Sequence, residues 1–232
     1  MTLVETLKEL DVENLIKNLE ILESTQHIKC VVPISGGKDS QSCLKLALQT
    51  YSPDKVLGLF CDTQYEHPLT YQHVEKMKEM YGVKIIHIND GGVYERIKEY
   101  GRFPSDIARF CTDQLKIRTA KMFYNYLSKA QESGFEVWYG MRLGESHQRS
   151  ERYKDKNEND LYEPHTIMIN KYPKYLARQG VMFRLPILKW EEEDVFEFLD
   201  GEENELYSKG FERVGCFPCL AAGDKYKEKA FS

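Results

Sequence analysis

Short apolar runs alternate with longer amphipathic segments along the first two thirds of the chain. The apolar runs at 30–34, 56–61, 83–88 and 136–139 predict buried β-strands. Segments with helical spacing predict helices over 7–22, from the loop after residue 34 to about residue 51, and over 68–81, 93–100 and 112–128. Alternating strands and helices indicate an α/β fold, in which parallel strands are joined by right-handed crossovers.

The alternation breaks after about residue 150. Residues 150–160 are highly charged and lack apolar periodicity, which predicts a surface loop. Short runs at 167–169 and 182–185 predict two further strands, and 190–199 predicts an amphipathic helix whose acidic first turn suits the helix dipole. The rest, 206–232, has no regular pattern. We therefore expect a doubly wound, mostly parallel sheet of about five strands, followed by an irregular cysteine-bearing segment.

The 232 residues suffice for one α/β domain or for a domain with a small appendage. We expect one domain over residues 1–232, with a helix within 1–26 and a cysteine-bearing part over 150–232 that faces the substrate. Hydrophobic residues make up 41% of the chain, enough for a core, and the net charge of -5 argues against strong non-specific nucleic-acid binding. No apolar stretch could span a bilayer, and the first residues do not form a signal peptide. We expect a cytoplasmic protein that does not associate with membranes.

The hexapeptide Ser35-Gly36-Gly37-Lys38-Asp39-Ser40 lies between the first predicted strand and the helix that follows. Its glycines allow a ligand to approach the backbone closely, and the helix start offers unpaired N–H groups, so this turn is a candidate phosphate site. Lys38 adds positive charge, and Asp39 is suited to hold a metal ion or to orient the loop. The spacing matches neither the Walker loop nor the dinucleotide fingerprint.

Other polar residues follow the predicted strands, at the edge of a parallel sheet where ligands gather. Asp62 and Thr63 end the second strand, and Asp62 is either a nucleotide or Mg²⁺ ligand or a turn cap. Gly140, Arg142 and Arg149 follow the fourth strand, and the two guanidinium groups suit phosphate or sulfate recognition.

Six cysteines in a chain without a secretion signal indicate thiols or metal ligands. Cys111 precedes a predicted helix, at which Thr112 is the expected N-cap, and Cys216 and Cys219 form a CxxC pair. These three cysteines suit a 4Fe–4S cluster with one open iron, zinc with a fourth ligand such as histidine, or no metal at all. Cys61 is a weaker fourth ligand, whereas the two remaining cysteines lie in apolar runs and fit the core.

Six ordered motifs between about residues 27 and 222 resemble the phosphoadenylyl-sulfate (PAPS) reductase family of the PP-loop ATP pyrophosphatase superfamily. They are SGGKDS at 35–40; Asp62-Thr63 with Pro68, Thr70 and Tyr71; Cys111 with Lys116; Gly140 with Arg142, Ser146 and Arg149; Pro186 with Trp190, Asp194 and Val195; and Leu206-Tyr207 through Gly215-Cys216-x-x-Cys219. The resemblance implies an adenine nucleotide α-hydrolase-like fold, with ATP or PAPS and Mg²⁺ at residues 35–40, Asp62, Thr63 and Gly140. It also implies that Lys38, Asp39, Asp62, Arg142 and Arg149 carry the chemistry.

Reductases of this family use a cysteine on a C-terminal Glu-Cys-Gly-(Ile/Leu)-His tail, which is not found in this sequence. We therefore expect adenylation of an acceptor in sulfur transfer, with an iron–sulfur cluster favoured over zinc at the three cysteines. Two alternatives stay open. One is sulfonucleotide reduction that releases sulfite, with the thiol of Cys216, Cys219 or a further segment. The other is nucleotide binding without turnover.

The expected partners are the nucleotide, a sulfur donor or reductant, and an acceptor that is a nucleic acid or a small molecule. Lys171, Lys174 and Arg178, interleaved with Tyr172 and Tyr175, form either a nucleic-acid contact or a solvated face. A homodimer is also left open.

Overall fold

A computed structural model describes residues 27–105, 108–220 and 222–231, and the helix predicted over 7–22 lies outside these residues. A five-stranded sheet in the order β3-β2-β1-β4-β5 forms the centre, and all its neighbouring strands are parallel. The strands are β1 (Cys30–Ile34), β2 (Val56–Asp62), β3 (Lys84–Asn89), β4 (Glu136–Trp138) and β5 (Met182–Arg184). The predicted α/β fold with a parallel sheet is therefore confirmed.

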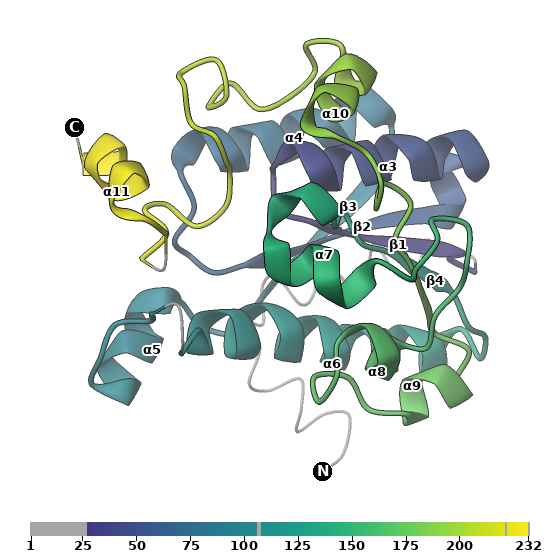
Figure 1. Ribbon diagram of the computed structural model, residues 1–232. Coiled ribbons are helices and arrows are strands. Elements are labelled where there is room, and N and C mark those ends of the chain that lie inside the picture. Colours follow the sequence, from purple (N-terminus) through teal and green to yellow (C-terminus); the bar gives the residue numbers. More distant parts are fainter. Residues whose placement is uncertain (1–26, 106–107, 221, 232) are drawn as a thin grey trace.

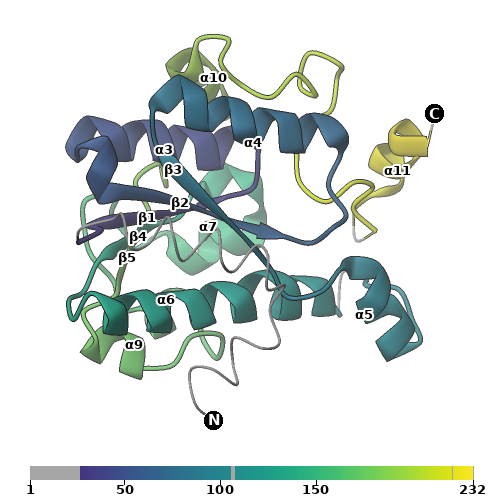
Figure 2. The same cartoon turned by 180° about the vertical axis from the view of Figure 1, so that it is seen from behind.

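Helices cover both faces of the sheet. They are α3 (Lys38–Thr50), α4 (Pro68–Tyr81), α5 (Val93–Tyr100), α6 (Thr119–Ala130), α7 (His147–Tyr153), α8 (Pro164–Ile167), α9 (Tyr175–Arg178), α10 (Glu192–Leu199) and α11 (Asp224–Phe231). The other helical segments are the 3-10 helices η1 (Pro53–Lys55) and η3 (Leu143–Glu145) and the π-helix η2 (Thr112–Arg118). Helices α3, α4 and α10 lie on one face, and α6, α8 and α9 lie on the other (Figure 1). Figure 2 shows the same layers from behind.

Each face of the sheet has its own hydrophobic core, because successive side chains of a strand point to opposite sides. Leu57 and Leu59 of β2 pack into the core that also contains Tyr124 of α6. Val56 and Phe60 of the same strand pack into the core on the α3 and α4 side. Burial on both faces explains why the strands are nearly continuous apolar runs in the sequence.

The strand order positions the candidate site. The chain builds outward from β1 through β2 to β3, and it then returns to the other side of β1 for β4 and β5. The topological switch point therefore lies between β1 and β4, which pair in parallel register at Cys30 and Glu136. Ligands in open α/β sheets bind beyond the carboxyl ends of the strands at this point. The segments there are the 35–40 loop after β1 and residues 139–142 after β4.

After residue 138, one local prediction was wrong and a second holds only in part. Residues 167–169 form no strand, because Pro164 starts the short helix α8 and the buried Ile167 ends it. The segment 150–160 is partly helical, since α7 starts after Ser146, whose side chain accepts a hydrogen bond from the Arg149 N–H. Tyr153 anchors α7, with its ring buried and its hydroxyl donating to the Ile167 carbonyl at 2.9 Å. A helix with a single buried side chain shows no helical spacing of apolar residues in its sequence.

Two further predictions need correction. Thr112 is not an N-cap, because Phe110 and Cys111 are already helical and Cys111 has right-handed helical dihedral angles. Phe110 is buried and stacks on the Tyr100 ring, with the two centroids 4.5 Å apart. The 206–232 segment is mostly irregular as predicted, but it contains α11. Within the described ranges, no helix has the length and apolar character needed to cross a membrane.

Candidate functional site

The loop between β1 and α3 is tightly closed by its own serines. The Ser40 hydroxyl accepts from the Ser35 N–H at 3.1 Å and donates to the Gly37 carbonyl at 2.9 Å, and the Gly37 N–H donates to the Ser35 hydroxyl at 3.3 Å. Gly36 has a φ of +74°, and a Cβ there would lie 2.5 Å from Thr70 Cγ2. Glycine is therefore required at residue 36 by both backbone conformation and space. The result is a compact turn that leads directly into the α3 N-terminus.

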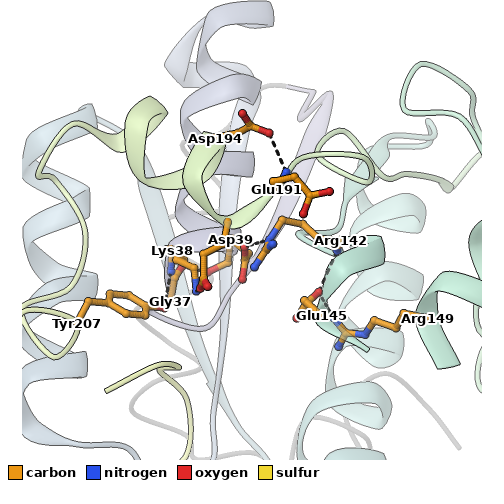
Figure 3. Close-up of polar contacts among 11 residues, drawn as sticks. Gly37, Lys38, Asp39, Arg142, Glu145, Arg149, Glu191, Asp194 and Tyr207 are labelled. Carbon is orange, nitrogen blue, oxygen red and sulfur yellow. Dashed lines mark hydrogen bonds and ion pairs between the residues drawn. The ribbon is translucent and has the colours of Figure 1, made fainter. Parts of the chain in front are cut away.

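The first turn of α3 faces a residue far along the chain. Gly37, the N-cap of α3, provides no side-chain cap, and the Lys38 N–H donates instead to the Tyr207 hydroxyl at 3.0 Å. Helix N-terminal N–H groups bind anions well because they lack partners within the helix. Figure 3 shows the Tyr207 ring reaching this turn from the C-terminal segment.

The Lys38 side chain is held among three groups from the C-terminal third of the chain. Its ammonium forms a 2.7 Å ion pair with Glu192 Oε1, and the side chain of Lys38 is only 4% exposed. The ammonium also lies over the rings of Phe196 and Tyr207, 5.3 and 4.8 Å from their centroids. Lys38 is thus near the loop, as predicted, with its charge balanced by a carboxylate of α10.

Asp39 and Arg142 form the second ion pair of the site. Arg142 Nε donates to Asp39 Oδ1 at 2.6 Å, and Arg142 is almost completely buried. Burial raises the pKa of Asp39 above its ordinary value, although the Arg142 guanidinium acts to lower it. A Cβ at Gly140 would lie 2.6 Å from the Asp39 carbonyl oxygen, so glycine lets the end of β4 approach α3. The structure therefore brings Asp39, Gly140 and Arg142 together.

Arg149 lies beyond this pair. Its guanidinium forms an ion pair with Glu145 Oε2, and the same oxygen accepts from the Arg142 N–H at 2.9 Å. Arg149 is therefore linked to Arg142 through Glu145 (Figure 3). Its side chain is 39% exposed, so it stands at the rim of the site.

The predicted residues Asp62 and Thr63 lie at the end of β2, next to β1. Asp62 Oδ1 accepts from the Tyr71 hydroxyl at 2.7 Å and from the Gln64 N–H at 2.8 Å, contacts typical of a turn-capping carboxylate. The buried Thr63 hydroxyl donates to Glu66 Oε1 at 2.7 Å and contacts Cys216 Sγ at 3.5 Å. Thr63 therefore connects the end of β2 to Cys216.

Cys216 is held by polar groups. Its sulfur lies 3.8 Å from Glu66 Oε1, and the two residues form an isolated antiparallel bridge. Lys116 hydrogen-bonds to Cys216. Although burial favours the neutral amine, Cys216 and Glu66 raise the pKa of Lys116 above its ordinary value. Burial raises the pKa of the Cys111 thiol, with a further contribution from Cys216.

The three predicted metal ligands do not form a ligand set in this arrangement. Across 27–105, 108–220 and 222–231, no group of three or more histidine, cysteine or acidic side chains is placed to hold a metal ion. Cys216 contacts a carboxylate, a hydroxyl and an ammonium group instead. Cys61, the weaker fourth candidate, donates to the Lys116 carbonyl at 3.7 Å, and burial raises its pKa to about 12. The assignment of metal to Cys111, Cys216 and Cys219 stays a prediction.

Sequence reasoning assigned no role to several residues of the site. Tyr207 belongs to the last of the six sequence motifs, but the residue that it contacts, Lys38, lies 169 positions earlier in the chain. Glu192 was interpreted only as part of an acidic helix start. In the proposed nucleic-acid contact, Tyr172 is buried, and Lys171 pairs with Asp113 at 2.6 Å. Lys174, Tyr175 and Arg178 are exposed, and the nucleic-acid contact stays a prediction.

Comparisons with known proteins agree with this geometry. The phosphoadenosine phosphosulfate reductase domain model matches residues 29–222. Uncharacterized protein MJ0066 of Methanocaldococcus jannaschii is 32% identical over 194 residues, which are 82% of this chain and 36% of that protein. The chain thus spans about a third of the length of this curated relative.

Two solved structures share the fold. A PAPS reductase from Candida auris, in a phosphate complex, is 16% identical with a TM-score of 0.53, and the match covers 85% of this chain and 87% of that chain. The U34-tRNA thiolase NcsA from Methanococcus maripaludis, with its 4Fe–4S cluster, is 17% identical with a TM-score of 0.53. The match covers 94% of this chain and 71% of the thiolase chain. Since the family model extends over most of the chain and the fold agrees, the protein belongs to the phosphoadenosine phosphosulfate reductase domain family.

Proposed function

We propose that this chain binds ATP with its β- and γ-phosphates on the 35–40 loop and cleaves it between the α- and β-phosphates. In the finer form of the proposal, the AMP moiety passes to an acceptor, and sulfur then displaces it. The observation that carries the proposal is the convergence of Lys38, on the α3 N-terminus, with Arg142 across the switch point. Two cations beside a glycine turn suit a polyphosphate better than a neutral ligand.

The charge pattern supports transfer at the α-phosphate. An acceptor oxygen would attack the α-phosphorus, the bond to the bridging oxygen would break, and pyrophosphate would leave with the electron pair. Negative charge then grows on the departing pyrophosphate, and preorganised cations stabilise such charge most effectively when water is excluded. Lys38 and Arg142 are both nearly buried, so each is suited to this task once a phosphate replaces its carboxylate partner.

Magnesium fits the donor chemistry of the site. Mg²⁺ in nucleotide sites usually takes one or two carboxylates together with phosphate oxygens, where it neutralises charge on the polyphosphate. Asp39 and Asp62 are the carboxylates that we assign to this task. Both now have hydrogen-bond partners of the chain itself, so metal binding would require a rearrangement of the Asp39–Arg142 or Asp62–Tyr71 contact.

Sulfonucleotide reduction is the second candidate, and the Thr63–Cys216 contact favours it. This contact places a thiol against the end of β2, next to the strand that leads into the phosphate loop. A thiol there would attack the sulfur of PAPS or adenylyl sulfate and release the nucleotide, leaving an S-sulfonate on the cysteine. A second thiol would then attack the cysteine sulfur, form a disulfide with it and release sulfite with the electron pair of the broken bond. Sulfite release from either nucleotide would favour this candidate over ATP cleavage.

Nucleotide binding tests the shared basis of both candidates. Isothermal titration with ATP and PAPS, each with Mg²⁺, should show binding that Lys38→Ala weakens by at least about tenfold, because a buried charge-assisted contact to phosphate is lost. Lys121→Ala, on α6 at the opposite face of the sheet, is the matched control and should bind like the unsubstituted protein. Unchanged affinity in Lys38→Ala would contradict the proposed site.

A further inference from the structure

Backbone groups of the phosphate loop form hydrogen bonds with a segment far along the same chain. The Tyr207 hydroxyl accepts a hydrogen bond from the Lys38 N–H. The Tyr207 hydroxyl and the Val214 carbonyl oxygen also lie close to Gly37, since a Cβ added there would be 3.2 Å from each of them. The Asn204 amide donates to the Gly36 carbonyl at 3.1 Å. Residues 202–217, which we name the strap, therefore lie directly on the loop that we assign to phosphate.

The strap is fastened on both sides of the loop. At its start, Glu202 Oε2 accepts from Lys45 at 2.7 Å and from the Tyr81 hydroxyl at 2.8 Å. At its end, Cys216 bridges to Glu66, and the backbone N–H of the next residue donates to the Tyr65 carbonyl at 2.6 Å. Both anchors are independent of the loop contacts, so the strap is attached at each of its ends as well as at the loop.

The ring of Tyr207 is packed in its present position. It contacts the Phe196 ring edge-to-face, with the two centroids 5.5 Å apart. Because Phe196 belongs to α10, this contact joins the middle of the strap to the helix that carries Glu192. Glu192 and Tyr207, which both contact Lys38, are therefore positioned by neighbouring parts of the C-terminal third of the chain.

The contacts on Lys38 have the chemistry of a bound phosphate. A phenol oxygen accepts from its backbone N–H, and a carboxylate oxygen accepts from its ammonium group at 2.7 Å. A phosphate group on a helix N-terminus with a neighbouring lysine would make these same two kinds of contact. Lys38 is 4% exposed, so a phosphate cannot reach its ammonium group unless Glu192 or the Tyr207 ring moves away.

Glu192 is able to move. Its side chain is 53% exposed and stands in the first turn of α10, so rotation of the side chain into solvent breaks its ion pair with Lys38. Resting on the proposed function, we propose that Tyr207 and Glu192 form an internal substitute for phosphate, which occupies the nucleotide site and which the polyphosphate must displace. Nucleotide binding therefore competes with the contacts that Tyr207 and Glu192 make to Lys38.

The affinities of matched variants test this inference. Tyr207→Phe keeps the ring and removes the hydroxyl, and Glu192→Gln keeps the shape and removes the charge. Each should bind ATP and inorganic pyrophosphate about three- to tenfold more tightly than the unsubstituted protein, because one internal competitor is gone. Glu193→Gln makes the same charge change one residue along α10 and should leave both affinities unchanged.

The outcomes separate this inference from the proposed function. If neither the unsubstituted protein nor any variant binds ATP or pyrophosphate, the proposed function fails, and the inference fails with it. If the unsubstituted protein binds but either Tyr207→Phe or Glu192→Gln binds equally or more weakly, only the inference is overturned. Equal tightening by Glu193→Gln would also overturn it, since a general charge effect would then explain the gain. Circular dichroism melts verify that each variant is folded.

Discussion

Arg142 Nε and Asp39 Oδ1 lie 2.6 Å apart although the two residues are separated by 103 positions in the chain. The ion pair joins the first turn of α3 to the segment after β4, which are the two sides of the switch point. Gly140 allows this approach because a side chain there would collide with the Asp39 backbone. The pair therefore ties the phosphate loop to the opposite half of the sheet.

Removal of one member of this pair should destabilise the fold. Arg142→Gln leaves a mostly buried carboxylate without its partner, and we expect the free energy of unfolding to fall by about 3 kcal/mol. The double variant Asp39→Asn/Arg142→Gln should recover part of this loss, since no unpaired charge then remains. Urea denaturation of the three proteins measures both effects. A double variant that is less stable than Arg142→Gln would contradict the account of the pair.

His73 should make the fold sensitive to acid. Burial disfavours the charged ring and lowers the pKa of His73 from an ordinary 6.5 to about 4, and its Nε2 lies 2.8 Å from Gln41 Oε1. Because the pKa of His73 is lower in the folded state than in the unfolded state, its contribution to the free energy of unfolding is fully present above about pH 6.5 and is lost as pH falls toward 4. The loss should be about 3 kcal/mol in unfolding free energy. Urea denaturation at several pH values measures this loss, and His73→Gln should lose less stability than the unsubstituted protein between about pH 6.5 and 4. If the free energy of unfolding falls equally with pH in both proteins, His73 does not have this role.

Gly36 should tolerate a side chain far less well than Gly82. Both glycines have positive φ, +74° and +59°, so alanine strains the backbone similarly at each. At Gly36 the new Cβ also meets Thr70 Cγ2, whereas nothing lies within 4 Å at Gly82. Gly36→Ala should therefore lower the melting temperature more than Gly82→Ala and should also weaken ATP binding. Equal effects on both measurements would show that the loop is not closely packed against α4.

Metal analysis tests the sequence-based role of the cysteines. If Cys111, Cys216 and Cys219 ligate a 4Fe–4S cluster, anaerobically purified protein should contain about four irons and four sulfides per chain, which Cys216→Ser abolishes. Cys43→Ser is the control, because Cys43 is buried in the core on the α3 side. A metal-free protein in which all three thiols react with iodoacetamide would contradict the ligand assignment.

The sheet was predictable because burial on both faces leaves nearly continuous apolar runs in strands such as β1 and β2. The phosphate loop was predictable for a different reason, since its glycines, lysine and serines are contiguous and act through local backbone geometry. Helix α7 was not predictable, because Tyr153 alone anchors it and a single apolar residue sets no period.

The partners of the site were beyond sequence reasoning. Residue types and strand ends place Lys38 and Arg142 at one edge of the sheet, but they do not say which side chains balance these charges. Glu192 reaches Lys38 only because α10 packs against α3, and Tyr207 only because the strap returns across the loop. Such contacts depend on tertiary packing between segments far apart in sequence.

The products formed from ATP test the central claim most directly. The protein is incubated with Mg²⁺ and ATP labelled at the α-phosphate, with water as a slow acceptor, and the nucleotide products are separated by chromatography. Cleavage between the α- and β-phosphates predicts labelled AMP and pyrophosphate, with formation strongly reduced in Lys38→Ala and unchanged in Lys121→Ala. Labelled ADP with inorganic phosphate, or AMP formation that is equal in Lys38→Ala, would contradict the account.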